Sequence, residues 1–149
     1  MTENFEFYKQ IAEEWIPMQK FLGFQLLHVE TDFASILIPA REEFIGDPRS
    51  LRMHGGLISL AMDATGGTAA FTRLPNLFED SIATIDLRVD YMSPARMEDL
   101  QTDARVLRAG ETTIFTDIKT FHPSTPEKVL AVGRAVYNIK PGKAKTQMP

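Results

Sequence analysis

The sequence predicts an α+β fold in which an antiparallel sheet of about six strands curls round one buried helix. Two patterns support this prediction. Residues 52–74 form a long run of small and apolar residues, RMHGGLISLAMDATGGTAAFTRL, and the glycines in it would let other backbone segments approach closely. Residues 81–140 then contain four runs in which apolar and polar residues tend to alternate, which is typical of strands with one buried face. A helix wrapped by a sheet satisfies both patterns.

Composition narrows the class of protein. A chain of 149 residues that is 44% hydrophobic is expected to form one domain over residues 1–149. The net charge of −4 indicates no bulk attraction to nucleic acid or to a membrane. The absence of cysteine excludes disulfides, thiolate metal sites and a cysteine nucleophile. The N-terminus, MTENFEFYKQ, is acidic and aromatic, unlike a signal peptide, so we expect a cytoplasmic protein.

The first half of the chain should begin with a helix followed by two strands. Residues 3–16 place apolar side chains at helical spacing, namely Phe7, Ile11, Trp15 and Ile16, and Pro17 should end that helix. Residues 1–22 are therefore expected to be an N-terminal helical extension. Residues 24–30 and 33–40 look like strands joined by a tight turn at Thr31-Asp32. Residues 40–53 show no clear period and are expected to be a surface loop.

The second half should contain four long antiparallel strands. They are expected in residues 81–95, 99–110, 111–123 and 128–140. Ala109-Gly110 is a hairpin signal, and the segment from Pro123 to Pro126 indicates a longer turn. The proline-containing basic tail of residues 141–149 is expected to be flexible. On the first of these strands, Arg88 and Asp90 share a face and should form a cross-strand ion pair.

One acidic residue in the predicted central helix needs an explanation. Asp63 is the only ionisable side chain between Gly55 and Phe71, so we interpret it as catalytic. The first turn of the helix, at Gly55, offers unpaired N–H groups at the positive end of the helix dipole, which suits a site that activates an electrophile. Neither His28 nor His122 has a companion at metal-ligand spacing, and no metal site is expected.

Three motifs of this sequence carry a resemblance to a known family. HGGLISLAMD, TIDLRVDYMSPA and VLRAGETTIFTDIK resemble hot-dog fold acyl-CoA thioesterases of the PaaI-like (phenylacetic acid degradation) type, and the likeness runs from about Gly23 to Asn138. The resemblance implies a homodimer, often paired into a homotetramer, in which Asp63 of one subunit serves Gly55 of the other. It also implies hydrolysis of an acyl-CoA to free acid and CoA, with no metal and no cofactor apart from the coenzyme A of the substrate.

The resemblance also suggests roles for individual residues. Asp63 would act as nucleophile or as general base, the Gly55 N–H would hold the oxyanion, and Thr84 would position the water or the carboxylate. His54, at the start of the helix, is a further catalytic candidate, although capping of local backbone is expected ahead of proton transfer. The residues that would contact coenzyme A are Gly56, Tyr91, Ser93, Pro94, Arg96, Arg108 and Gly110. The two arginines among them are suited to phosphate.

One position departs from the family pattern. Related enzymes usually carry an Asn shortly before HGG, where this chain has Pro48. Either Arg49 or Arg52 substitutes for it, or Gly55 alone holds the carbonyl. Two alternatives to the hydrolase therefore stay open, a non-catalytic acyl-CoA-binding protein and, ranked well below it, a hydratase or dehydratase.

The acyl group is expected to be small or medium. Met53 and Met62 should pack or line an acyl tunnel. The tunnel width should depend on residues 40–53, on the N-terminal helix and on side chains such as Phe44, Met62 and Phe71.

Overall fold

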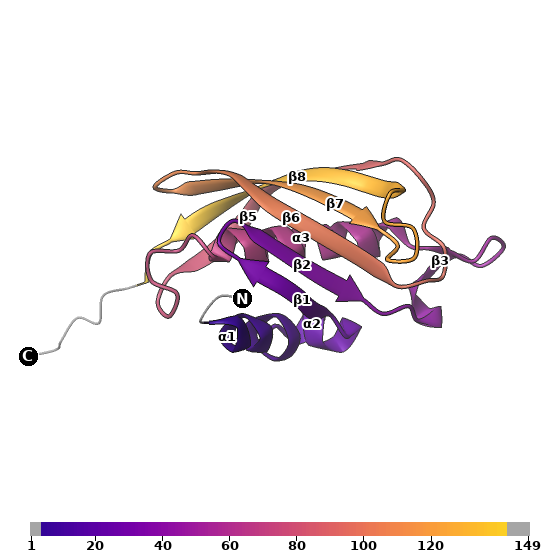
Figure 1. The fold of residues 1–149 in the computed structure, drawn as a ribbon, viewed down its shortest axis with the longest axis horizontal. Coiled ribbons are helices and arrows are strands. Elements are labelled where there is room, and N and C mark those ends of the chain that lie inside the picture. The colour runs from indigo at the N-terminus through magenta and orange to yellow at the C-terminus, as the bar shows by residue number, and fades with distance from the viewer. Residues whose placement is uncertain (1–3, 143–149) are drawn as a thin grey trace, which may run out of the picture.

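The computed structural model describes residues 4–142 and confirms the predicted fold class. One long helix, α3 (Gly55–Phe71), lies against a six-stranded antiparallel sheet that curves around it (Figure 1). The strand order is β1-β2-β6-β7-β8-β5. The strands are β1 (Gln25–Glu30), β2 (Phe33–Ile38), β5 (Ser81–Tyr91), β6 (Leu100–Ala109), β7 (Thr113–Phe121) and β8 (Val129–Lys140).

The glycines of α3 allow the close approach that their number predicts. A Cβ built on Gly66 would lie 2.4 Å from the Tyr137 hydroxyl oxygen and 2.8 Å from Cδ1 of Ile118. Only glycine therefore lets this turn of the helix rest on β7 and β8. Met62 is fully buried on the same helix, so it packs in the core. The helix is shorter than the predicted 52–74 segment, because the residues before His54 belong to a short strand.

Residues 40–53 hold more structure than the surface loop expected from the sequence. A 3₁₀ turn, η2 (Glu42–Phe44), leads into a two-stranded ribbon of β3 (Ile45–Asp47) and β4 (Arg52–Met53). Phe44 and Met53 are both buried and anchor this segment beneath the start of α3. Strands of two or three residues are too short to show a period in the sequence, which is why the prediction missed them.

The N-terminal extension differs from the single helix predicted over residues 3–16. It consists of α1 (Phe5–Gln10), a π-helical turn η1 (Ile11–Trp15) and a second helix α2 (Pro17–Leu22). Pro17 begins α2 instead of only ending a helix, because proline is well suited to the first helical position. The buried residues of the first part are Tyr8 and Ala12, whereas Trp15 is 60% exposed, so the predicted apolar face was wrong. Because a π turn contains more residues than an α turn, the side chains after it point in other directions than a regular α-helix would give.

The turns that the sequence predicted are confirmed. Asp32 adopts φ 69° in the tight turn between β1 and β2, a conformation that Asp tolerates. Gly110 closes the β6–β7 hairpin by donating its N–H to the Thr113 carbonyl. Arg88 pairs with Asp90 of its own strand (3.2 Å), which corrects the predicted cross-strand pair. Of the tail expected at 141–149, residues 143–149 lie outside the described residues, as do residues 1–3.

Two features of the periphery position the site. Strand β5 lies at an edge of the sheet and pairs only with β8 within residues 4–142. The N-terminal helices lie beside β1, at the other edge (Figure 1). Within the same residues, no helix combines the length and the hydrophobicity that crossing a bilayer requires.

Candidate active site

Asp63 sits at the middle of α3 with its side chain and its backbone held by two different strands. The Thr84 hydroxyl of β5 donates a hydrogen bond to Asp63 Oδ1 (2.8 Å). The Tyr137 hydroxyl of β8 donates to the Asp63 backbone carbonyl (2.8 Å). Burial, together with the nearby charge of Asp63, raises the pKa of Tyr137, so this phenol stays protonated and remains a donor. The carboxylate is therefore oriented rather than free to rotate in solvent.

A cavity of about 290 Å³ opens beside Asp63. Its wall comes from the second half of α3, the start of β5, Tyr137 and the N-terminal helices, and includes Tyr8, Ile11, Gln19, Ala64, Phe71 and Ile82. Of the three side chains expected to set the tunnel width, Phe71 lines this cavity, but Phe44 and Met62 do not. Met62 instead points into the core, where its Cε would lie 2.8 Å from a Cβ on Gly133. The N-terminal helical extension contributes to this wall, as the sequence predicted, and none of the residues 40–53 does.

The first turn of α3 provides a second polar feature. Gly55 is the first helical residue, so its N–H has no intrahelical acceptor, and no acceptor among residues 4–142 takes it. The Gly56 N–H donates to Nδ1 of His54 (2.8 Å), which confirms His54 as a capping residue. The Tyr91 hydroxyl donates to the Gly55 carbonyl (2.7 Å) and lies 2.8 Å from the Ser59 hydroxyl. These contacts leave the Gly55 N–H as the available donor of this turn.

The two polar features are too far apart to act on one bond within a protomer. Eight residues of helix separate Gly55 from Asp63, a rise of roughly 12 Å. The residues expected to bind coenzyme A also form two groups, one near Gly55 and one near Asp63. Tyr91 ends β5 beside Gly55, and Ser93, Pro94 and Arg96 follow it in the chain. Arg108 and Gly110 lie at the hairpin where Ile114 pairs with Tyr137 and Tyr137 with Thr84, at the Asp63 end. One chain thus presents two half-sites.

The segment around Pro48 provides no obvious replacement for the family's Asn. The Asp47 carboxylate accepts hydrogen bonds from the backbone N–H and the Nε of Arg49 (both 3.1 Å) and from the Ser50 hydroxyl. These bonds lower the pKa of Asp47 and direct the Arg49 guanidinium toward Asp47 rather than toward Gly55. Arg52 is exposed on β4.

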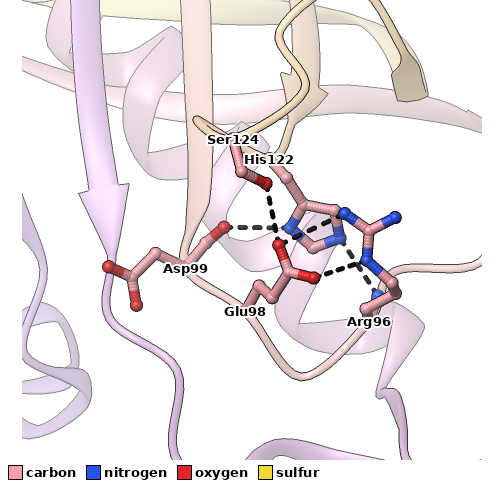
Figure 2. A network of polar contacts seen from close by, with 5 residues as sticks. All are labelled: Arg96, Glu98, Asp99, His122 and Ser124. Atoms are coloured by element: carbon pink, nitrogen blue, oxygen red, sulfur yellow. Dashed lines mark hydrogen bonds and ion pairs between the residues drawn. The ribbon is translucent and has the colours of Figure 1, made fainter.

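Arg96 belongs to a network of polar contacts that the sequence did not predict (Figure 2). Its guanidinium pairs with both oxygens of Glu98 (2.5 and 3.2 Å), and the Ser124 hydroxyl donates to Glu98 as well. The bond from Arg96, followed by that from Ser124, lowers the pKa of Glu98 to about 2. A bound phosphate would therefore have to compete with Glu98 for Arg96.

His122 anchors the segment that carries this arginine. Its ring is 1% exposed, and its Nε2 accepts the Arg96 backbone N–H (3.0 Å), while its Nδ1–H donates to the Asp99 carbonyl (2.9 Å). The sequence indicated only that His122 has no companion at metal-ligand spacing. Because both ring nitrogens bond to backbone, the imidazole fixes the path of residues 96–99 between β5 and β6.

Comparison with known proteins places the chain in a family. The sequence pattern of the Thioesterase superfamily matches residues 52–128. The medium/long-chain acyl-CoA thioesterase YigI of Escherichia coli is 32% identical over 106 residues, which are 64% of this chain and 68% of that protein. A candidate esterase of Halobacterium salinarum is 34% identical over 125 residues, which are 80% of this chain and 82% of that protein.

Solved structures share the fold. A thioesterase of Haemophilus influenzae superposes with a TM-score of 0.82 at 16% identity, covering 99% of this chain and 97% of that chain. A protein of Shewanella oneidensis related to the thioesterase superfamily gives a TM-score of 0.81 at 23% identity, covering 91% and 95% of the two chains. The PaaI-like subtype stays a prediction. The chain belongs to the thioesterase superfamily and is a thioester hydrolase of the hot-dog fold.

Proposed function

We propose that this protein hydrolyses a small or medium acyl-CoA thioester to free acid and CoA in a homodimer. Each active site would combine Asp63 of one subunit with the Gly55 N–H of the other. The observation that carries the proposal is the Asp63 carboxylate, which Thr84 orients beside a cavity of about 290 Å³. The similarity to an acyl-CoA thioesterase of Escherichia coli supports the choice of coenzyme A ester.

The edge strand β5 supports the proposed dimer. Strand β5 pairs with β8 on one side, and its other side has no partner within residues 4–142. It exposes Ile85 (59%) and Tyr91 (53%), which is unusual for apolar side chains on a long edge strand. Antiparallel pairing of two β5 strands would bring the Thr84 end of one chain against the Tyr91 end of the other. Asp63 would then approach the partner's helix N-terminus.

The proposed reaction uses these groups one after another. The thioester carbonyl oxygen accepts the Gly55 N–H, and a donor in this position stabilises the developing oxyanion by about 2.7–4 kcal/mol. Asp63 either removes a proton from the attacking water or attacks the carbonyl carbon itself. The tetrahedral intermediate then collapses, the C–S bond breaks, and the CoA thiolate leaves and takes up a proton. Where Asp63 is the nucleophile, this step leaves an anhydride between the acyl group and Asp63, and a water molecule then hydrolyses it. The acyl carbon ends as a carboxylic acid.

The coenzyme A part would extend over residues of both chains. Arg108 is exposed near the β6–β7 hairpin and makes no ion pair with any residue of 4–142, so its guanidinium is available for phosphate. Arg96 of the partner subunit would leave its ion pair with Glu98 and bind a second phosphate oxygen instead. The cavity volume lies near the lower end of small-molecule sites, about 300 Å³, which favours a small or medium acyl group.

The test is thiol release from a panel of acyl-CoA esters by the wild type and by Asp63→Asn. We expect kcat to fall by at least ~100-fold, the size of losing a base or nucleophile, with the affinity for CoA nearly unchanged. Asp117→Asn is a matched control, because Asp117 is an exposed partner of Arg134 on β7. Equal rates for the wild type and Asp63→Asn would overturn the proposal.

A further inference from the structure

The face of the sheet that points away from α3 is hollowed and carries charges of both signs. The hollow has a volume of about 790 Å³ and crosses β2, β6, β7, β8 and β5. Phe33 and Val132 contribute apolar side chains to it, and Val132 is 37% exposed. None of the helices of residues 4–142 lies on this side of the sheet (Figure 1). The face is therefore accessible to another protein surface.

The charges on this face follow one rule along three of the strands. Successive outward-facing residues have opposite signs, namely Arg88 and Asp90 on β5, Asp103 and Arg105 on β6, and Asp117 and Lys119 on β7. The strand register arranges the charges in two rows across the sheet. One row contains Arg88, Arg134, Asp117 and Arg105, and the other contains Asp90, Val132, Lys119 and Asp103. At every charged position except Arg134, the other row therefore has the opposite charge on the same strand.

One pair of neighbours in these rows is unfavourable within the chain. Arg88 and Arg134 lie directly opposite each other on β5 and β8, and like charges in that position destabilise a sheet. The Arg88 guanidinium pairs with Asp90 (3.2 Å), and that of Arg134 pairs with Asp117 (2.9 Å). Pairing within the chain alone would not favour two arginines at these positions. An acidic group from outside the chain would offset their repulsion.

We propose that this outer face binds the same face of a second copy of the chain. A two-fold axis that runs across the strands, between the two rows, sets each row against the other row of the partner. Each residue of the three pairs then faces the oppositely charged residue of the same pair in the partner, and Asp90 of the partner subunit faces Arg88. A two-fold interface is self-complementary in this way. Two twisted sheets can pack face to face with their strands nearly aligned.

This second interface is compatible with the proposed β5 dimer. The axis would cross β5 near Val89, close to the midpoint of the β5 pairing. Two perpendicular two-fold axes that meet there generate an assembly of four chains. Each active site would still need only the two chains joined by β5, so the inference does not depend on the proposed hydrolysis.

The experiment reverses one charge and then restores the pattern. Lys119→Glu sets a glutamate against Asp117 of the partner subunit, twice in each interface, so the dissociation constant of the face-to-face assembly should rise by ~100-fold or more. Adding Asp117→Lys restores opposite charges across the interface and should return the constant to within ~10-fold of the wild type. Lys128→Glu, at an exposed position between β7 and β8, is the matched control and should keep the wild-type constant. Sedimentation velocity over a concentration series measures all four proteins.

Effects within the chain predict the opposite result for the double variant. The lysine introduced at position 117 would lie opposite Arg105 and Arg134, and the glutamate introduced at position 119 would lie opposite Asp103. Both changes add like-charge contacts within the chain, so recovery of assembly can come only from the partner. A wild-type mass that Lys119→Glu does not lower at any concentration would overturn the inference, as would a double variant that stays as dissociated as Lys119→Glu.

A second set of variants covers the case in which Lys119→Glu does not fold. Arg105→Glu on β6 sets a glutamate against the partner's Asp103 and should weaken the assembly to a similar extent. Adding Asp103→Lys should restore it. The same two outcomes, no loss of mass in the single variant or no recovery in the double variant, would contradict the interface.

Discussion

At the scale of single residues, the site depends on which polar groups already make a hydrogen bond within the chain. The Gly56 N–H is taken by His54, whereas the Gly55 N–H is not taken by any described residue. Nδ1 of His54 is therefore engaged as an acceptor, which does not favour His54 as the proton-transfer partner that a hydratase would need. Asp63 receives one hydrogen bond at Oδ1 from Thr84. A carboxylate held by one hydroxyl keeps lone pairs for water or for a carbonyl carbon.

The Arg96–Glu98 pair leads to a prediction about coenzyme A binding. Glu98→Gln should release the guanidinium for phosphate and lower KM for an acyl-CoA by up to about fivefold, the range of an exposed ion pair. The bond from Arg96 depresses the pKa of Glu98 to about 2, so the stabilising pair is complete above the usual carboxyl pKa. It is lost only as pH falls from the usual pKa toward that value.

Steady-state KM measured between about pH 5 and 8 should therefore show the same benefit of Glu98→Gln throughout. The control is Arg96→Gln. Adding Glu98→Gln to this variant should leave KM unchanged. An unchanged or raised KM in Glu98→Gln would argue against a phosphate contact by Arg96.

At the scale of elements, the contact between α3 and the sheet depends on Gly66. Gly66→Ala places a methyl group 2.4 Å from the Tyr137 hydroxyl, so it should destabilise the protein by about 1–3 kcal/mol as an overpacked site. That cost outweighs the helix-propensity gain of about 1 kcal/mol. Displacing Tyr137 should also lower kcat, because its hydroxyl holds the Asp63 carbonyl.

Gly67→Ala is the matched control on the same helix. The nearest atoms to its Cβ would lie at 3.6 Å, an ordinary contact, so the propensity gain should dominate and stability should stay level or rise by up to about 1 kcal/mol. Urea unfolding of both variants measures the difference. Equal stabilities would contradict the packing argument.

The same scale shows what the sequence could and could not predict. Strands β5 and β7 were predictable from the alternation of apolar and polar residues, and β7 has the buried face that such a period indicates. The helix of α3 was predictable, including its first turn at Gly55, whereas β4 was not, because it has only two residues. In the N-terminal helices, the π turn at Ile11–Trp15 moves Trp15 out to solvent, and no periodicity argument anticipates such a shift.

Some residues of the candidate site were predictable from the sequence, and others were not. Asp63 was conspicuous as the one acid of an apolar helix, and Thr84 was found only through the family resemblance. His122 carries no local signal, because its importance comes from contacts with residues 96–99 that tertiary packing creates. The split of the coenzyme A residues between the two ends of the sheet also appears only in three dimensions.

At the scale of the whole molecule, the proposed site combines Asp63 of one chain with Gly55 of another. This can be tested with two variants that each remove one half-site. Asp63→Asn removes the carboxylate. Gly55→Pro removes the N–H at the first helical position, where proline is well tolerated, and the Cβ that it adds would lie 3.3 Å from the Tyr91 ring. Gly55→Ala adds the same Cβ but keeps the N–H, so it is the matched control and should retain far more activity than Gly55→Pro.

Mixing the two inactive variants should restore activity. In a mixed dimer, the Asp63→Asn chain contributes an intact Gly55 and the Gly55→Pro chain contributes an intact Asp63, so one of the two sites is complete. With random exchange of subunits, half of the dimers are mixed, and about a quarter of wild-type activity should return. The measurement is thiol release after the two proteins have been unfolded together and refolded, beside each variant refolded alone. A site contained within one chain would give no recovery, because no protomer in the mixture carries both groups.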